Sequence, residues 1–380
     1  MQQSRLRSND SSGSSTVPRL DSTLRRSPTP PPLPPRPQKS WLYEGLTSEA
    51  KARAAVVSAV SSCPHFLARY SAQEVLGYGA NGVCISALDN LAGRIVAIKI
   101  VYPSGKDVRI PSEVDSLRTL CSNGRLPNVI EYVDHFQDNN YFYVVTNLVT
   151  ANWSRFSSDF EPASSLTVIS DGFSCDLPFG TGNSDLWAWC SLHRNLLLQS
   201  QGHMLLPTTV VKHIVKNIAI AMQAIHYREF YHGDLKFENV FLDINPDRYD
   251  APLIYLGDFG HAKRISNGIY QYGTNEMAGP ELLADAPFDK QRLDGRCADI
   301  FALGLILYTL LSEDGQFPTV VKPLVSYSCL IADGASSFPL PPILDLEQEA
   351  CSLIESMVCV HPDQRAAIDD VLSHPWLNSN

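Results

Sequence analysis

Four side chains in two short motifs have the chemistry that phosphoryl transfer requires. The motif HGDLKFEN contains Asp234, Lys236 and Asn239, and the motif GDFG contains Asp258. Transfer of a phosphoryl group from a nucleotide needs metal ions to neutralise the triphosphate, a carboxylate near the accepting hydroxyl, and a cation on the moving group. Asp258 and Asn239 offer the hard oxygen ligands that Mg²⁺ binds, and Asp234 can orient the hydroxyl. These motifs therefore predict a metal-dependent phosphoryl-transfer site.

A glycine-rich segment, LGYGANG (residues 76–82), lies between two strand-like runs. Glycines let backbone N–H groups approach phosphate oxygens without interference from a Cβ atom. A dinucleotide-binding fold would need a helix after the third glycine, but the run VCISAL predicts another strand. The segment therefore predicts a glycine-rich hairpin. For this motif alone, a hairpin without a ligand is an equal alternative.

Lys99 ends the apolar run VAIK. A lysine in an apolar run costs desolvation unless its ammonium meets an anion. Its natural partner is Glu113 in the predicted helix SEVDSLRTLC, where Leu117 lies one turn later and faces the core. The alternative is a lysine at the end of a strand that extends to water.

The elements that must position these residues fall into a strand-rich region and a helical region. Runs such as RIVAIKIVY and NYFYVVTNLV predict strands between about residues 66 and 149. From about Asp185, the 3.6-residue spacing of VVKHIVKNIAIAMQAIHY predicts helices. Residues 45–62 predict a short helix packed on the strand-rich region. Residues 150–184 have weak periodicity, and we treat them as an insert of unknown conformation.

Composition limits the class of protein. The chain has 380 residues, of which 44% are hydrophobic, so it can bury a large core. Its longest near-apolar run, residues 300–311, is shorter than the ~20 residues that a membrane-spanning helix needs and predicts a buried helix. The N-terminus lacks a secretory pattern. Nine scattered cysteines without a CxxC pair argue against a disulfide or zinc framework and predict a cytoplasmic or nuclear protein.

Charge is unevenly distributed between the first 40 residues and the rest. Residues 1–40 carry a net charge of +5 and the remaining residues −15. An acidic body disfavours nucleic acid as a partner and is compatible with basic peptides. Residues 1–40 are rich in Ser, Pro and Arg and predict a disordered tail. Within them, Pro31-x-x-Pro34-x-Arg36 resembles the ligand core of Src-homology 3 adaptor domains, and a plain linker is the alternative.

In their order along the chain, these motifs resemble those of the eukaryotic protein kinase family, over about residues 71–377. The resemblance implies an α+β, bilobal fold that comes after a helical lead-in (41–70). It implies a small β-rich N-lobe (71–149), the insert (150–184) and a larger helical C-lobe (185–377). ATP would bind in the cleft between the lobes together with Mg²⁺.

The resemblance assigns a role to each matching residue. Lys99 would contact the α- and β-phosphates while paired with Glu113, Asp234 would be the catalytic aspartate, and Lys236 would steady the γ-phosphate beside Thr274. Asn239 and Asp258 would hold magnesium. The expected ATP contacts are Leu76, Gly77, Gly79, Gly82, Cys84, Ala97, Lys99, Thr146, Asn147, Val149, Asp185 and Phe241. Among them Thr146 matches the gatekeeper and Asn147 to Val149 the hinge.

Other matches concern the framework and the substrate. Gly279-Pro280-Glu281 stands where the family has Ala-Pro-Glu, with Arg365 as the partner of Glu281, and Asp299 with Gly304 marks the helix that anchors the catalytic loop. Lys236 and Gly273-Thr274 resemble serine/threonine kinases rather than tyrosine kinases. The resemblance implies a protein that acts on Ser or Thr of protein substrates. We expect a monomer that binds neither nucleic acid, because its body is acidic, nor a membrane, because its apolar runs are short. Glu238 and Asp185 match positions that read arginines upstream of the acceptor.

Three departures from the family pattern motivate an alternative function. Gly233 replaces the Arg of His-Arg-Asp, Cys84 replaces a Val over adenine, and Gly279 replaces the Ala of Ala-Pro-Glu. A fourth departure, Phe241 in place of a Leu at the floor of the pocket, keeps that position apolar. We expect an active kinase, because Lys99, Asp234, Asn239 and Asp258 are all intact. We expect altered regulation, because Gly233 has no side chain to bind a phosphate and because the position four before Thr274, where the phosphorylated residue commonly lies, is Tyr270. The alternative is a nucleotide-binding pseudokinase that acts as a regulatory scaffold.

Overall fold

A computed structural model describes residues 46–79, 81–103, 111–150, 165–170, 173–178, 184–244, 251–283, 285–313, 326–332, 334 and 336–379. The predicted tail 1–40, with its motif Pro31 to Arg36, lies outside the described residues. So do Ala80 and most of the insert.

A five-stranded antiparallel sheet carries the first group of predicted site residues. Its strands are β1 (Tyr70–Tyr78), β2 (Gly82–Asp89), β3 (Arg94–Val101), β4 (Tyr132–Gln137) and β5 (Phe142–Asn147), in the order β1-β2-β3-β5-β4. Helix α3 (Ser112–Cys121) connects β3 to β4. The glycine-rich segment joins β1 to β2, so the hairpin that the sequence predicted is present.

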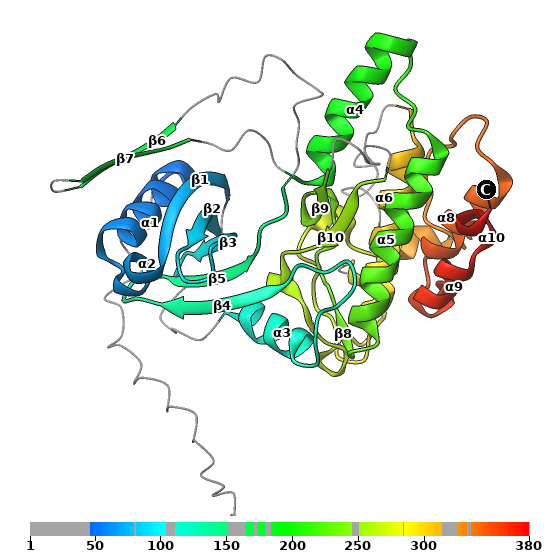
Figure 1. The fold of residues 1–380 in the computed structure, drawn as a ribbon. Coiled ribbons are helices and arrows are strands. Elements are labelled where there is room, and N and C mark those ends of the chain that lie inside the picture. Colours follow the sequence, from blue (N-terminus) through cyan, green and yellow to red (C-terminus); the bar gives the residue numbers. More distant parts are fainter. Residues whose placement is uncertain are drawn as a thin grey trace, which may run out of the picture. The chain divides into compact units, whose positions relative to one another are not determined.

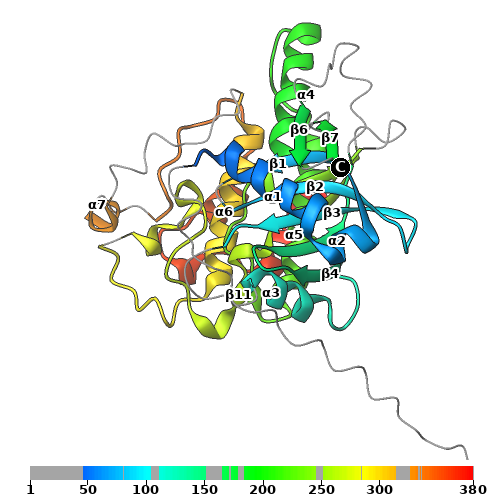
Figure 2. The same cartoon turned by 90° about the vertical axis from the view of Figure 1, so that its left-hand side faces the viewer.

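The two faces of the sheet differ in burial. Along β3, Val96, Ile98 and Ile100 are buried, whereas Ala97 and Lys99 between them are half-buried, as the two-residue period of a strand requires. The buried face packs on α1 (Ser48–Ser62) and α2 (Pro64–Arg69). Both views show α1 beside the first strands (Figures 1 and 2). The other face carries Ala97 and Lys99, which are among the predicted site residues.

Helices α1 and α2 are part of the core of the N-lobe. Thr47 caps α1 by accepting a hydrogen bond from the N–H of Ala50. The small side chains of α1 allow close approach to the sheet, and Val56 is completely buried. Phe66 of α2 belongs to the same cluster. The helix predicted for residues 45–62 is therefore present, with a second helix after it.

The C-lobe is mainly helical. Its helices are α4 (Leu186–Gln201), α5 (Thr208–His226), α6 (Gly295–Leu311), α7 (Tyr327–Ala332), α8 (Gln348–Met357), α9 (Ile368–Ser373) and α10 (Pro375–Asn378). Its short strands are β8 (Phe230–Tyr231), β9 (Val240–Asp243), β10 (Leu253–Leu256) and β11 (Lys263–Arg264). Figure 1 shows α8, α9 and α10 grouped together at one end of the C-lobe. The buried helix predicted at residues 300–311 is confirmed as part of α6.

A β-hairpin lies within the insert, whose conformation the sequence left open. Its strands are β6 (Ser165–Ser170) and β7 (Phe173–Pro178). β6 lies near α1 and β7 near β1, and Leu177 is buried in the core of the N-lobe. Within the described residues, no helix has the length and apolar character needed to cross a membrane. The architecture confirms the predicted α+β fold with a sheet-rich N-lobe and a helical C-lobe.

Candidate active site

Three charged side chains from three distant segments form an ion cluster. The Lys99 ammonium on β3 lies 3.0 Å from Oε2 of Glu113 on α3 and 2.7 Å from Oδ1 of Asp258. The Lys99–Glu113 pair that the sequence predicted is therefore present, and Asp258 shares the cation. Burial would lower the pKa of Lys99, but the charges of Glu113 and Asp258 outweigh burial and raise this pKa above its ordinary value. Lys99 is a fixed cation.

Asp258 is ionised at neutral pH. Burial raises the pKa of its carboxyl, but the Lys99 ammonium opposes burial more strongly and lowers the pKa to about 2. Its backbone has φ +54°, which is uncommon for a residue other than glycine. The Asp258 side chain is 38% exposed, so part of its carboxylate is accessible to solvent.

Asp234 is surrounded by hydrogen-bond donors. Its Oδ1 accepts from Oγ1 of Thr274 at 2.6 Å, and its Oδ2 accepts from Nδ2 of Asn239 at 3.2 Å. The ammonium of Lys236 lies 3.5 Å from Oδ2 and also donates to Thr274 at 3.1 Å. We define the catalytic loop as residues 232–239 and the activation segment as residues 258–281. Lys236 and Asn239 of the loop and Thr274 of the segment thus all contact the carboxylate of Asp234, as the predicted site requires.

Gly273 lets Thr274 reach Asp234. A Cβ atom on Gly273 would lie 2.5 Å from Cγ of Asp234, which is closer than real contacts allow. The N–H of Gly273 donates to the carbonyl of Gly233 at 2.8 Å. A side chain at position 273 would therefore displace the carboxylate that the site depends on.

The catalytic loop is anchored on helix α6. The carboxylate of Asp299 accepts the backbone N–H groups of His232 at 2.6 Å and Gly233 at 2.9 Å. His232 accepts the N–H of Asp234 at Nδ1, so its Nε2 is the nitrogen that donates to the carbonyl of Gly257. This arrangement fixes the backbone before Asp234 and links it to the strand end before Asp258.

Asn239 and Asp258 fit the role of magnesium ligands. Nδ2 of Asn239 donates to the carbonyl of Asp234 at 2.7 Å, which leaves its Oδ1 as the acceptor. Within the part of the chain that the structure describes, neither Oδ1 of Asn239 nor Oδ2 of Asp258 accepts a hydrogen bond. Both side chains thus offer a hard oxygen atom, as Mg²⁺ requires.

The predicted ATP contacts of the sheet share its half-buried face. Cys84 is paired with Lys99 across β2 and β3, and Ala97 is paired with Thr146 across β3 and β5. Residues paired directly across strands point to the same face, so these four side chains line one surface. Leu76, Gly77 and Val149 are also half-buried. Asn147 holds β5 to the chain before β4, because its Oδ1 accepts the N–H of Glu131.

Gly79 and Gly82, near the turn between β1 and β2, differ in how much space surrounds them. A Cβ atom on Gly82 would lie 2.5 Å from the carbonyl of Ile100, so Gly82 is needed for strand packing. A Cβ atom on Gly79 would meet no other atom within 4 Å, and the N–H of Gly79 donates to the carbonyl of Gly82. The space beside Gly79 is therefore open, which is compatible with the phosphate-covering role that the resemblance assigns to this loop.

Phe241 is accommodated by a glycine on the neighbouring strand end. A Cβ atom on Gly257 would lie 2.6 Å from Cε2 of Phe241. The larger ring at this position therefore fits only because Gly257, which precedes Asp258, has no side chain. Asp185 forms a β-bridge with Phe241 and caps α4 by accepting the N–H of Ala188 at 2.8 Å.

The framework residues also meet as the sequence predicted. Both carboxylate oxygens of Glu281 accept from Arg365, at 2.8 and 2.5 Å, and both side chains are buried. A Cβ atom on Gly279 would collide with the carboxylate of Glu281, so glycine at this position suits the geometry of the pair. Gly304 lets α6 approach α8, because a Cβ atom there would lie 2.7 Å from Val358.

Gly233, the main departure from the family pattern, has a conformation that glycine favours. Its φ is +75°. A Cβ atom would lie 2.7 Å from the carbonyl oxygen of His261 and 3.2 Å from the ring of Tyr231. The backbone is therefore closed around this glycine, and an arginine would not fit without a shift of the chain.

Sequence reasoning missed several residues that hold the activation segment. On α3, Ser112 donates to the carbonyl of Gly260 at 3.0 Å and Ser116 to that of Ala262 at 2.9 Å. The hydroxyl of Tyr272 accepts the N–H of Leu235 at 2.9 Å. The charged partners could be inferred from their chemistry, but an ordinary Ser or Tyr gives no such signal.

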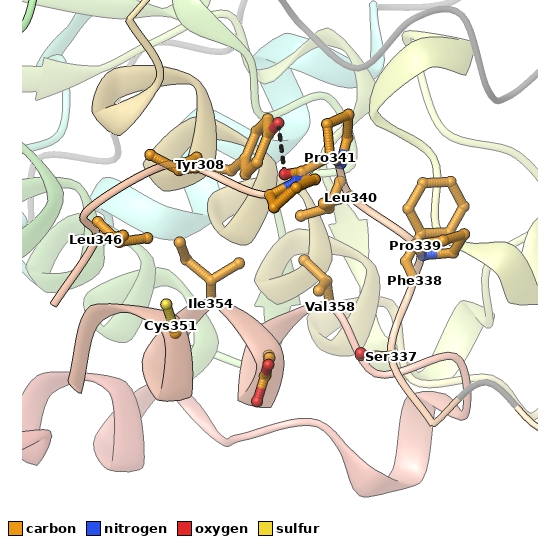
Figure 3. A pocket seen from close by; sticks show the side chains of 13 residues that line it. Tyr308, Ser337, Phe338, Pro339, Leu340, Pro341, Leu346, Cys351, Ile354 and Val358 are labelled. Atoms are coloured by element: carbon orange, nitrogen blue, oxygen red, sulfur yellow. Dashed lines mark hydrogen bonds between the residues drawn. The ribbon is translucent and has the colours of Figure 1, made fainter. Parts of the chain in front are cut away.

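A separate cavity of about 370 Å³ lies in the C-lobe (Figure 3). Residues 337–346 form one wall, and Tyr308 of α6, Ile354 of α8 and Val358 just after α8 line the rest. The hydroxyl of Tyr308 donates to the carbonyl of Pro341 at 3.0 Å. None of the residues predicted to do chemistry lines this cavity, so it is distinct from the candidate active site.

Comparison with known proteins agrees with this geometry. Residues 189–377 match the family described as protein kinase domain. The calcium/calmodulin-dependent protein kinase type II alpha chain of Drosophila melanogaster is 25% identical over 325 residues, which cover 84% of this chain and 51% of the relative. Serine/threonine-protein kinase D3 of Mus musculus is 26% identical over 315 residues, covering 80% of this chain and 29% of the relative.

A third relative is similar over most of its own length. The calcium/calmodulin-dependent protein kinase type 1 of Macrobrachium nipponense is 25% identical over 318 residues, which cover 82% of this chain and 76% of the relative. By contrast, the chain spans about half or less of the two relatives above. Residues 189–377 therefore match a protein kinase domain, the fold agrees with this match, and the chain is distantly similar to serine/threonine protein kinases.

Proposed function

We propose that the chain is a serine/threonine protein kinase that transfers the γ-phosphate of Mg·ATP to Ser or Thr of protein substrates. The observation that supports this most strongly is that the charged and polar groups that phosphoryl transfer requires are all present and form two clusters of contacts. Lys99 is bound to Glu113 and Asp258, and Asp234 is bound to Thr274 and Asn239. A chain that had lost catalysis would be free to lose these groups, and this chain retains all of them.

Each residue has a defined task in this proposal. When bound by Asp258 and Asn239, magnesium would neutralise the charge of the triphosphate. Lys99 would hold the α- and β-phosphates, since its ammonium is fixed by two carboxylates. Asp234 would orient the hydroxyl of the substrate and accept its proton, and Lys236 would neutralise the transferred group.

The proposed substrates carry basic residues near the acceptor. Glu238 is exposed next to the catalytic loop and can meet an arginine. Asp185 is 6% exposed and caps α4, so we assign this role to Glu238 alone. The acidic balance of residues 41–380 supports the same preference.

The test is transfer of labelled phosphate from ATP to a generic basic protein. Asp234→Asn, Lys99→Met and Asp258→Ala should each lower the rate by about 10² to 10³, because each removes a charge that acts on the transition state. Ser266→Ala, an exposed change in the activation segment, should leave the rate unchanged. Activity within about tenfold of the unaltered chain in any of the three variants would contradict the assignment.

The same experiment addresses the pseudokinase alternative. If the unaltered chain binds ATP, as measured by a rise in its unfolding temperature with nucleotide and magnesium, but transfers no phosphate, the regulatory scaffold is the better description. Thermal unfolding of each variant without ligand controls for loss of the fold.

A further inference from the structure

Tyr272 in the activation segment is buried at the point where this segment meets the catalytic loop. Its side chain is 1% exposed. Its hydroxyl donates to Oδ1 of Asp299 at 3.0 Å and accepts the backbone N–H of Leu235 at 2.9 Å. One phenol therefore joins the activation segment, the catalytic loop and helix α6.

Three consecutive residues make this contact. Tyr272 binds Leu235 and Asp299, the N–H of Gly273 donates to the carbonyl of Gly233, and Thr274 donates to Asp234. Each residue of the catalytic loop from Gly233 to Leu235 thus has a partner in residues 272–274. A shift of Tyr272 would move Thr274 away from the carboxylate of Asp234.

The hydroxyl of Tyr272 remains a neutral donor under all ordinary conditions. Burial and the nearby charge of Asp299 raise the pKa of Tyr272 well above its usual value. Asp299 itself stays ionised, because hydrogen bonds from His226 and the backbone outweigh the effect of burial and lower its pKa. The contact is therefore charge-assisted, which makes it stronger than a neutral hydrogen bond.

Because residue 233 is a glycine, this chain lacks a second way of joining the activation segment to the catalytic loop. In kinases with Arg at this position, the guanidinium binds a phosphate on the activation segment and orders it. Here the position has no side chain, and the carbonyl of His261 blocks the direction in which one would leave the backbone. The guanidinium of Arg264, which is itself in the activation segment, lies over the ring of Phe230, with its carbon atom 4.9 Å from the ring centre.

We propose that Tyr272 is a positioning residue that holds the activation segment against the catalytic loop, so that this segment needs no phosphate to become ordered. The proposal rests on the kinase function proposed above. It predicts that the unphosphorylated chain is active and that Tyr272 acts on kcat through the placement of Asp234. It also predicts that Tyr272 itself is not a phosphorylation site in the folded protein, whereas Tyr270, at 51% exposure, is accessible.

The test compares Tyr272→Phe with Tyr270→Phe in the full chain after phosphatase treatment. Tyr272→Phe removes one oxygen atom and leaves the N–H of Leu235 buried without its acceptor, so kcat should fall by about tenfold or more. The KM for ATP should stay within about twofold, because Lys99 and Asp258 are untouched. Tyr270→Phe should change neither constant, and phosphatase treatment should not change the activity of the unaltered chain.

Hydrogen exchange supplies a second measurement that does not require activity. The amides of Leu235 and Gly273 should exchange at least about tenfold faster in Tyr272→Phe than in Tyr270→Phe. If both kcat and exchange in Tyr272→Phe match the unaltered chain, or if phosphatase treatment abolishes activity, the proposal is wrong. If the unaltered chain transfers no phosphate at all, the kinase function fails, and hydrogen exchange alone then decides whether Tyr272 positions the loop. If the Tyr272→Phe chain does not fold, phosphatase treatment of the unaltered chain decides the question. Activity that survives this treatment supports the proposal, and activity lost with it contradicts the proposal.

Discussion

At the scale of single residues, two glycines decide the geometry around Asp234. Gly233 provides a left-handed backbone against the carbonyl of His261, and Gly273 leaves room for Asp234 itself. Neither glycine takes part in the proposed chemistry. Each controls where a charged neighbour lies.

Gly233→Ala should lower the free energy of unfolding by about 1 to 3 kcal/mol, because the new Cβ atom meets a carbonyl oxygen in addition to the strain of a positive φ. Gly202→Ala is the matched control. Gly202 has nearly the same φ, +76°, but no atom lies within 4 Å of its Cβ position, so its cost should be about 1 kcal/mol. Denaturant unfolding measures both values. Equal costs would show that the contact with His261 is not tight.

Gly273→Ala should reduce phosphoryl transfer by about 10² or more, because its Cβ atom would displace the carboxylate of Asp234. The unfolding temperature should stay close to that of the unaltered chain, so that the loss of rate is not a loss of the fold. Ser266→Ala, in the same segment but exposed, is the control and should keep full activity. Retention of activity in Gly273→Ala would mean that the carboxylate can be moved without consequence, which contradicts the role given to Asp234.

At the scale of elements, helix α6 is the support of the catalytic loop and is capped at both ends. Asp294 accepts the N–H of Arg296 at its start. At its end, the buried guanidinium of Arg194 on α4 donates to the carbonyls of Thr309 and Leu310 at 3.0 and 3.1 Å, and to that of Ser312 at 2.7 Å. The last carbonyls of a helix lack partners within it, and a cation there also favours the helix dipole.

Arg194→Met should therefore lower the free energy of unfolding by about 2 to 4 kcal/mol, since several buried carbonyls lose charge-assisted donors. Arg53→Met is the control. Arg53 forms an exposed pair with Glu49 one turn away on α1, and its loss should cost less than about 0.5 kcal/mol. Chemical unfolding of both variants measures the difference. Similar costs would show that water replaces Arg194 at the helix end.

The sequence predicted much at the level of elements and charges, and the reasons are physical. Lys99, Asp234 and Asp258 could be recognised because few residue types can perform phosphoryl transfer and because their order along the chain is restrictive. The run that forms α6 could be recognised because it is apolar on all sides. In both cases each individual signal lies within a short motif or run.

What the sequence did not reveal depends on contacts between distant segments. The role of Tyr272 arises only when residues 235, 272 and 299 are brought together, and Arg194 looks like any cation on a helix. The conformation of Gly233 could not be inferred either, since a glycine permits a positive φ without requiring one. The position of β6 and β7 in the N-lobe depends on their contacts with α1 and β1, which no local pattern specifies.

At the scale of the whole molecule, the ion cluster joins two separate cores. The buried face of the sheet packs with α1 and α2, whereas Val114, Leu117 and Leu120 of α3 pack with the large core of the C-lobe. The pair between Lys99 and Glu113 therefore spans the boundary between the two cores. A movement of one core relative to the other would change the distance between Lys99 and Glu113.

Acid should destabilise the molecule between about pH 4 and pH 2. The guanidinium of Arg69 on α2 binds both oxygens of Asp89, at 3.1 and 2.8 Å, and lowers the pKa of that carboxyl to about 2, as Lys99 does for Asp258. A carboxyl whose pKa is lower in the folded state stabilises the fold above its unfolded pKa, and this stabilisation is lost as the pH falls toward the folded value.

Asp89→Asn should therefore be less stable than the unaltered chain at pH 7 and should lose less stability between pH 4 and pH 2. Unfolding temperatures measured across this range test both statements. If the two proteins show parallel profiles, the Arg69–Asp89 pair does not contribute to acid unfolding, and other carboxyls must account for it.

The conformation of Gly233 has a further consequence for which single mutations are accessible to this chain. A change of this codon to arginine would place a side chain where the carbonyl of His261 lies, so the substitution would damage the loop before any phosphate could be bound. Dependence on a phosphorylated activation segment could be acquired only after the backbone at residues 231–233 and near residue 261 had changed. A change from glycine to arginine at this position thus requires several coordinated substitutions, and the first of these alone would destabilise the catalytic loop.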